Sequence, residues 1–428
     1  MRRVLTIVAA ATVVGAACSG PTPTGATATT QRVSTPMASD STVVEYPDAI
    51  TRELDRMASM PRPVEPSAMP PRHLDSSAFP QALVDRERIV FGGAPPDGIP
   101  PIDAPRYESA GDVEWIEPNE PVVVLDLGGD VRAYPVQVMI WHEIVNDELG
   151  GTPVAVTYCP LCNSGVAFAR TVGAEVLDFG TSGALYQANL VMYDRQSESL
   201  WTQFDGRAVV GTRVGDELEV LPTSMVSWAD YVRAHPEGSV LARDVDDPKP
   251  YGTNPYAAYD QRTSTVDGFF VGEVDETLPP YARVVGIEID GRAVAVPTGA
   301  LAEVGVATTE LGDISLVFWY RSGTSSALNA PRVADGEDVG ATGVFVAEVD
   351  GEAAVFTPND VGFVDSVTGT TWNVLGVGVD GPRSGDRLRQ IAHVDTFWFS
   401  WATFRAGGAI LDPSLDPLPG AASDGPGD

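Results

Sequence analysis

The sequence is short of positive charge, of histidine and of cysteine, and no apolar run reaches the ~20 residues needed to span a bilayer. It carries 27 Lys and Arg against 59 Asp and Glu, for a formal net charge of −32. This balance argues against nucleic acid as a partner and against electrostatic docking on anionic lipid. Three cysteines and four histidines leave few residues for site chemistry. Apolar residues still make up 43% of 428, which excludes a wholly disordered chain.

The N-terminus indicates export. Two arginines precede an apolar stretch from Val4 to Ala17, the dimensions of a signal peptide, which we place at 1–17. The letters G-A-A-C ending at Cys18 resemble a bacterial lipobox, although Gly15 stands where a large aliphatic residue is usual. We expect Cys18 to carry a lipid that anchors the chain to the outer face of the cytoplasmic membrane. Plain secretion is the alternative.

Low-complexity segments flank the part of the chain that should fold. Residues 18–74 start with Ser, Pro, Thr, Gly and Ala and continue rich in Pro and Met, and we interpret them as a disordered tether behind the lipidated cysteine. Residues 412–428 are Pro, Gly, Asp and Ser, and we expect a disordered tail there.

Repeated motifs suggest an internal duplication. Arg132 follows a Gly-Asp turn and is echoed by Arg292, 160 positions later (292 − 132). Asp194 and Trp201 frame a polar turn, and an Asp and a Trp with the same spacing recur 171 positions later. Similar order at a nearly constant offset predicts two tandem copies of one unit of about 160 residues.

We place the first copy at 75–250 and a second, degenerate copy at 251–411. At the offset of 160, the positions of Cys159 and Cys162 fall on a Trp and a Ser, so the cysteine pair belongs to the first copy alone. A feature kept in one copy favours a single specialised site, with the other copy as scaffold.

Within a copy, strands and turns dominate. Residues 121–127 are apolar and β-branched, a G-G-D turn follows, and 131–134 continue as the second strand of a hairpin. Residues 153–158 predict another buried strand. Thr223 or Ser224 predicts the N-cap of a helix that carries Trp228. The fold class that follows is α+β and rich in β.

The motif C-P-L-C at Cys159 and Cys162 is the one chemically loaded stretch, and its first interpretation is dithiol redox chemistry. Two residues between thiols allow a small disulfide, and a neighbour can lower the pKa of one thiol. A ring this small stabilises little, which favours reaction over bracing. His142 and Glu143 lie upstream and could move the proton. The redox partner or small-molecule ligand is open.

A metal site is the second interpretation. A C-P-x-C turn can aim two thiolates at one transition metal, such as zinc, iron or copper. Cys159, Cys162 and His142 would be ligands, with His393 or His235 as a fourth. The third interpretation is structural: two buried cysteines or an inert disulfide in a non-catalytic binding or scaffold lipoprotein.

A rigid loop at 92–103 precedes these motifs. Its letters, G-G-A-P-P-D-G-I-P-P-I-D, lack the Lys-Ser/Thr ending of a phosphate loop. Asp97 and Asp103 could line a site, but turn formation is the default interpretation of both.

Seven motifs occur in order along the chain. They are G-G-x-P-x-D-G-I-P-x-I-D, R-A-Y-P, W-H-E-I-V-N-D, P-V-A-V-T-Y-C-P-L-C-N-S, L-V-M-Y-D-R-x-S-x-S-L-W, H-P-E-G-S-V-L and F-W-F-S-W. Together they resemble the exported bacterial and archaeal family called domain of unknown function 3179, from about Asp75 to about Phe404. The resemblance implies the domain and leaves its activity open. Members described as selenoproteins imply redox use of the cysteine pair.

Overall fold

The computed structural model describes residues 52, 80–243, 248–263, 266 and 268–413. The signal peptide, the lipidation site Cys18 and all of the tether except Arg52 lie outside these ranges, as does the tail beyond residue 413. Within them the fold is α+β and rich in β, as the sequence predicts. No helix of the described residues is long and apolar enough to cross a membrane.

The first half of the fold is built from short strands around two seven-residue helices. Its elements are η2 (Arg86–Arg88), β1 (Ile89–Phe91), β2 (Tyr107–Ser109), η3 (Ala110–Asp112), β3 (Pro121–Leu127), β4 (Asp130–Pro135), α2 (Val136–His142), β5 (Ile144–Leu149), β6 (Thr152–Cys159), β7 (Ser164–Ala169), β8 (Thr171–Val172), β9 (Glu175–Val176), β10 (Phe179–Tyr186), β11 (Asn189–Asp194), β12 (Leu200–Thr202), β13 (Arg207–Val210), β14 (Glu219–Leu221), β15 (Thr223–Ser227), α3 (Trp228–Ala234) and β16 (Ser239–Leu241).

The second half continues with the same kinds of element. They are β17 (Arg283–Ile289), β18 (Arg292–Pro297), α4 (Thr298–Val304), β19 (Val306–Leu311), β20 (Ile314–Arg321), η4 (Val333–Asp335), β21 (Ala341–Val346), β22 (Glu348–Val349), β23 (Glu352–Ala353), β24 (Phe356–Pro358), β25 (Phe363–Asp365), β26 (Thr371–Trp372), β27 (Gly378–Asp380), β28 (Val394–Phe397), α5 (Trp398–Phe404) and β29 (Ala409–Ile410).

The sheets of the two halves have matching strand orders. The first half has β15-β3-β4-β16-β2, and the second has β28-β17-β18-β29. The last shared strand is parallel to its neighbour in both cases, β16 to β4 and β29 to β18. The meander β5-β6-β7 has a counterpart in β19-β20-β21. Such agreement is what a duplication would produce, and the duplication itself stays a prediction.

The side-chain bonds of the repeated polar turn also match. The indole N–H of Trp201 donates to Asp194 Oδ2 at 2.9 Å, and Trp372 donates to Asp365 Oδ2 at the same distance. Each aspartate lies at the end of a strand and accepts further bonds from the turn that follows it. The recurring Asp and Trp of the sequence therefore close the same local structure twice.

The offset of 160 is two residues short for the first strands of each half. β3 begins at Pro121 and β17 at Arg283, an offset of 162 (283 − 121). The residue pairs that close the two hairpin turns are Leu127↔Asp130 and Ile289↔Arg292, and they are also offset by 162 residues. By strand position, Cys159 therefore corresponds to Arg321, the last residue of β20, rather than to a tryptophan.

The helix predicted from Thr223 or Ser224 starts later. Residues Thr223–Ser227 form β15, which pairs along its full length with β3. The helix α3 begins at Trp228, and its N-cap is Ser227, whose hydroxyl accepts from the N–H of Asp230 at 3.1 Å. Pairing to a buried strand satisfies the backbone there and delays the helix by one short strand.

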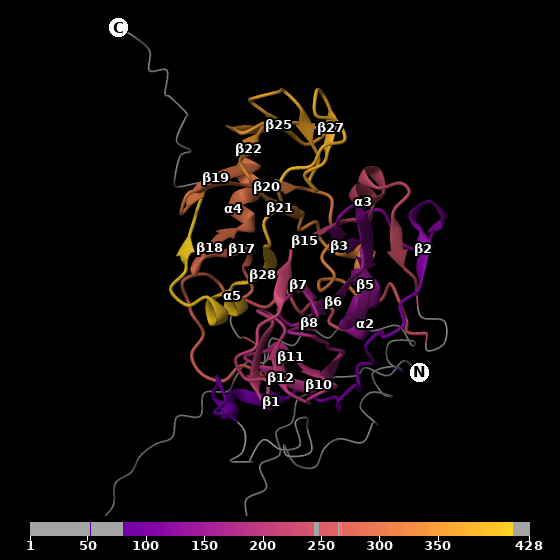
Figure 1. The fold of residues 1–428 in the computed structure, drawn as a ribbon, viewed down its shortest axis with the longest axis vertical. Coiled ribbons are helices and arrows are strands. Elements are labelled where there is room, and N and C mark those ends of the chain that lie inside the picture. The colour runs from indigo at the N-terminus through magenta and orange to yellow at the C-terminus, as the bar shows by residue number, and fades with distance from the viewer. Residues whose placement is uncertain (1–51, 53–79, 244–247, 264–265, 267, 414–428) are drawn as a thin grey trace, which may run out of the picture.

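The two halves pack against each other through shared cores (Figure 1). The cluster around α2, β6 and β7 includes Leu328, Phe397 and Phe399 of the second half. A second cluster joins Val122 and Trp228 to the second half. Strand β28 contacts β7, and β15 contacts β21. The end of the β6–β7 hairpin, with its two cysteines, thus lies in the interior near the junction of the halves.

Candidate functional site

The cysteines lie at the closed end of the β6–β7 hairpin. Cys159 pairs with Ser164, and residues 160–163 form the turn between them. Pro160 opens the turn, and its carbonyl accepts from the N–H of Asn163 at 3.3 Å. Asn163 has φ 54, a left-handed conformation that Asn tolerates better than most residues. The motif therefore leads into the strand β7 rather than into a helix.

Both thiols are free and buried. Cys159 is 1% exposed and Cys162 is not exposed. The backbone N–H of Leu190 donates to the Sγ of Cys159 at 3.4 Å. The Sγ of Cys162 lies 3.0 Å from the hydroxyl of Ser164. The sulfurs thus sit in a polar lining inside a hydrophobic cluster, instead of in apolar packing alone.

A chain of polar side chains continues from Cys162. The hydroxyl of Ser164 donates to Gln203 Oε1 at 3.0 Å, and Gln203 Nε2 donates to the hydroxyl of Thr157 at 2.8 Å. All three residues are buried. A satisfied buried network holds its members in one geometry, so Cys162 is oriented by the strand register and by Ser164.

Burial dominates the ionisation of Cys159. It raises the pKa of this thiol well above its usual value, and the hydrogen bond with the Cys162 thiol acts in the same direction. The N–H groups of Leu190 and Cys162 oppose that shift because they donate to the sulfur. Burial therefore favours the neutral Cys159 thiol at rest, with two backbone donors already aimed at the atom on which negative charge would develop.

Glu143 brings a carboxyl group to Cys159. It is the C-cap of α2, in a left-handed conformation with φ 59, and it is 6% exposed. Its carbonyl accepts from the N–H of Tyr158 at 2.8 Å, which ties it to the strand that ends in Cys159. Burial raises the pKa of the carboxyl well above its usual range, with a smaller contribution from Cys159. Burial therefore favours the neutral form of the Glu143 carboxyl.

Left-handed backbone occurs at several buried turns of this half. Nine described non-glycine residues have positive φ, and the four that are buried are Glu143, Asn163, Gln187 and Ala188. The last two form the turn that leads into β11, whose Leu190 donates to Cys159. At the position equivalent to Glu143, after α4, the chain has Gly305 with φ 75. Backbone strain of about 1–3 kcal/mol per residue persists where the surroundings impose it, often at functional sites.

The structure does not join His142 to the sulfurs. Its Nδ1 lies 2.7 Å from the carbonyl of Pro100, and its Nε2 lies 2.7 Å from the hydroxyl of Tyr251. Since a carbonyl can only accept, the proton is on Nδ1 and Nε2 accepts from the tyrosine. Both ring nitrogens hold neighbouring segments in place. Of the other predicted site residues, Cys159 and Cys162 share one turn, and the backbone of Glu143 bonds to Tyr158, the residue before Cys159.

The other predicted metal ligands lie elsewhere in the fold. His235 follows α3 as its C-cap. His393 precedes β28, with its Nδ1 2.9 Å from the carbonyl of Ile391. In the described ranges, no group of three or more His, Cys, Asp or Glu side chains is close enough to hold a metal ion.

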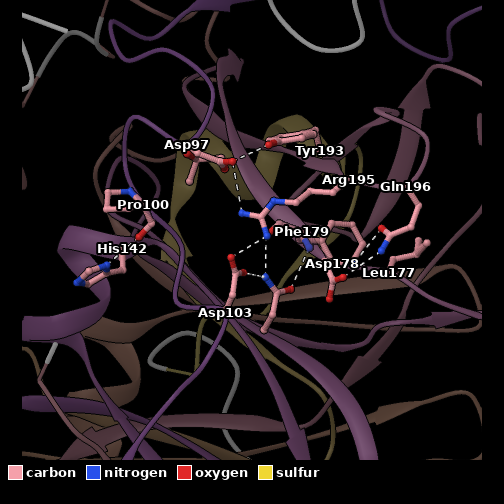
Figure 2. Close-up of polar contacts among 12 residues, drawn as sticks. Asp97, Pro100, Asp103, His142, Leu177, Asp178, Phe179, Tyr193, Arg195 and Gln196 are labelled. Carbon is pink, nitrogen blue, oxygen red and sulfur yellow. Dashed lines mark hydrogen bonds and ion pairs between the residues drawn. The ribbon is translucent and has the colours of Figure 1, made fainter. Parts of the chain in front are cut away.

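The loop at 92–103 covers the His142 side of α2 (Figure 2). Arg195 binds Asp103 at 2.8 Å and Asp97 at 3.4 Å, and the hydroxyl of Tyr193 donates to Asp97 at 2.7 Å. The same loop presents the Pro100 carbonyl to His142. Asp97 and Asp103 thus fasten the loop, in line with the default interpretation. Arg195 was not predicted, because only the fold brings it to a loop some ninety residues earlier in the chain.

The other groups that sequence reasoning missed are the Leu190 N–H, Ser164 and Gln203. A backbone donor leaves no sequence signal. Ser164 follows the motif directly and could have been considered from its position. Gln203 reaches the site only through strand pairing.

A family model whose description is "Protein of unknown function (DUF3179)" matches residues 96–407. The match covers most of the described part of both halves, including the cysteine motif. No curated protein and no solved structure shows significant similarity to the chain.

Proposed function

The chain belongs to this family, domain of unknown function 3179, and we propose that Cys159 and Cys162 form a reversible thiol–disulfide couple with Glu143 as the proton carrier. The observation that carries the proposal is the burial of two free thiols in one turn, with the N–H of Leu190 donating to the Cys159 Sγ and the Ser164 hydroxyl 3.0 Å from the Cys162 Sγ. The half that lacks the cysteines has a glycine in place of Glu143.

The proposed reaction is disulfide exchange with a disulfide-bearing co-reactant. The Cys159 thiolate attacks one sulfur of the co-reactant and releases the other as a thiol, which forms a mixed disulfide. Cys162 then attacks the Cys159 sulfur and releases the second thiol. Two electrons and two protons leave the pair, and the co-reactant becomes two thiols.

The neutral carboxyl of Glu143 suits the reverse reaction, in which the Cys159–Cys162 disulfide is reduced. An incoming thiolate attacks Cys159 and releases Cys162 as a thiolate, and a second thiolate then opens the mixed disulfide and releases Cys159 with a negative charge on its sulfur. A neutral carboxyl beside Cys159 can protonate it, while the N–H of Leu190 stabilises the charge until then. In the forward direction the carboxyl first loses its proton to solvent, and the carboxylate then takes the proton of the Cys159 thiol, as microscopic reversibility requires.

Burial sets the kinetics of the couple. Because the sulfurs are at most 1% exposed, exchange needs an opening of the 160–163 turn, where Leu161 is partly exposed. We therefore expect slow reaction in the folded protein and a strong acceleration when the turn is loosened.

The test is a redox titration with a mass readout. A Cys18→Ser background leaves only the pair to be counted. The protein is equilibrated in glutathione buffers over roughly −320 to −150 mV, then alkylated after denaturation. We expect a two-thiol to no-thiol transition, and a single alkylated thiol in Cys159→Ser and Cys162→Ser at every potential. A pair that remains two thiols over the whole range would overturn the proposal and leave a structural role.

The predicted export and lipid attachment at Cys18 rest on the sequence and are part of the proposal. The mass of the mature N-terminus after expression in a bacterium tests them. A diacylglyceryl adduct on Cys18 is expected, and an unprocessed Met1 would exclude it.

A further inference from the structure

A hollow between the two halves lies on the other side of the cysteine turn, and we call it the junction pocket. Its lining joins Asn163 of the first half to Arg283, Thr324, Ser326 and Asp395 of the second. About 440 Å³ of it is free of atoms, with the solvent at its mouth included. It is not the sulfur site: Cys159 and Ser164 face one side of the hairpin, and Tyr158, which bonds to Asn163, faces the other.

Two buried polar atoms in this lining have no hydrogen-bond partner. The amide nitrogen of Asn163 and the hydroxyl of Thr324 are both unpartnered, although each residue is only 2% exposed. The amide oxygen of Asn163 accepts from the hydroxyl of Tyr158 at 3.2 Å, and in this orientation the N–H₂ group of the amide has no partner. Buried polar groups in proteins almost always have a partner, so these two indicate that something else occupies the pocket.

The remaining polar groups favour an occupant that accepts hydrogen bonds. Arg283 uses one nitrogen on Asp260 and Ser326, both at 2.8 Å, and its guanidinium has further donors. One oxygen of Asp395 accepts from Thr342 at 2.6 Å. Burial raises the pKa of Asp395, which makes its second oxygen a donor when the group is neutral. Amide, hydroxyl, guanidinium and acid all offer hydrogens.

We propose that the junction pocket binds a small monocarboxylate, whose two oxygens accept from Asn163 Nδ2 and Thr324 Oγ1 beside the Arg283 guanidinium. Because the 440 Å³ includes solvent at the mouth, the proposal is restricted to a ligand of a few heavy atoms. The inference does not depend on the redox proposal, because none of these groups contacts a sulfur.

Binding there would brace the cysteine turn. Asn163 is the last residue of the turn, and the carbonyl of Cys162 accepts from the Thr396 hydroxyl at 2.7 Å and the Phe397 N–H at 3.1 Å. Thr396 also lines the pocket. A ligand on Asn163 therefore holds the turn to the second half, and we expect it to slow alkylation of the folded pair.

The experiment is thermal unfolding of the full chain in sodium acetate, with sodium chloride at equal ionic strength as reference. We expect acetate to raise Tm by about 1–3 °C over the chloride value, with saturation in the tens of millimolar. Acetamide, which has nearly the same shape as acetate but no charge, should not raise Tm. An acetamide shift as large as that of acetate would overturn the carboxylate assignment, and no acetate-specific shift would mean that the pocket holds water only.

Two variants test whether the acetate-dependent shift in Tm comes from the junction pocket. Thr324→Val keeps the shape of the side chain and removes its hydroxyl, and Asn163→Gly tolerates the left-handed backbone and removes the amide. Both should lose the acetate shift, while Thr308→Val on β19 should keep it. If Thr324→Val does not fold, Asn163→Gly decides alone. An acetate shift retained in the pocket variants would place the ligand elsewhere and refute the proposal.

Discussion

Glu143→Gln tests whether the acid beside Cys159 is neutral in the folded protein. Glutamine has nearly the same shape and cannot ionise, so the variant isolates the proton. A carboxyl whose pKa is raised on folding is neutral in the folded protein over a pH range in which the unfolded chain is ionised. Folding is therefore penalised above the ordinary pKa of 4.5, and the penalty is absent below it.

The expected size follows from one proton. Above pH 4.5, the free energy of unfolding of Glu143→Gln minus that of the natural protein should increase by about 1.4 kcal/mol per pH unit, until the pH passes the pKa of the folded carboxyl. Groups common to both proteins cancel in this difference. Urea unfolding followed by tryptophan fluorescence at pH 5, 6 and 7 measures the slope.

Glu148→Gln is the matched control, since this residue lies on β5 near Glu143 but is exposed. Because the side chain is exposed, its replacement should change the free energy of unfolding little. A constant difference for Glu143→Gln would refute the neutral carboxyl, and with it the proton carrier of the proposed function.

Three further predictions concern other buried or ion-paired side chains of the fold. Burial raises the pKa of Glu120 to about 7, so Glu120→Gln should stabilise the protein by about 3 kcal/mol at pH 8 and by almost nothing at pH 4, in urea unfolding at both values. The hydrogen bonds of Asp365 outweigh its burial and lower its pKa, so the stability that this carboxylate contributes is lost as the pH falls below 3.8. Asp365→Asn should lower the free energy of unfolding by about 2–4 kcal/mol at pH 7. Asp194→Asn, which removes the same bond to a tryptophan, should lower it by a similar amount. Arg195→Ala should speed amide hydrogen exchange of the 92–103 loop about fivefold, which corresponds to about 1 kcal/mol for partly exposed ion pairs, and an unchanged rate would show that the arginine does not hold the loop.

The sequence predicts the local elements well where pattern and turn chemistry agree. The hairpin of β3 and β4 follows from β-branched residues around a two-glycine turn, and Gly128 and Gly129 both have positive φ there. The strand β6 and its turn at C-P-L-C follow in the same way. The predicted helix start at Thr223 or Ser224 is wrong because Thr223–Ser227 pairs with the strand β3, and the local sequence pattern does not show this pairing.

The site is predictable only in part. The cysteine pair and Glu143 are evident from spacing, but the direction of the His142 ring depends on Pro100 and Tyr251, which come from distant segments. The left-handed backbone of Glu143 has no sequence signal of its own. It becomes visible only when the strands of the two halves are matched and a glycine is found at the equivalent position.

The most direct test of the central claim is the redox state of the pair in Cys18→Ser protein. After exposure to oxidised glutathione and removal of excess reagent, the intact mass should fall by two hydrogens, and the denatured protein should take up no alkylating reagent. Dithiothreitol should restore both thiols. Two freely alkylated cysteines after oxidation, in a protein that has been loosened enough for the reagent to enter, would contradict the account.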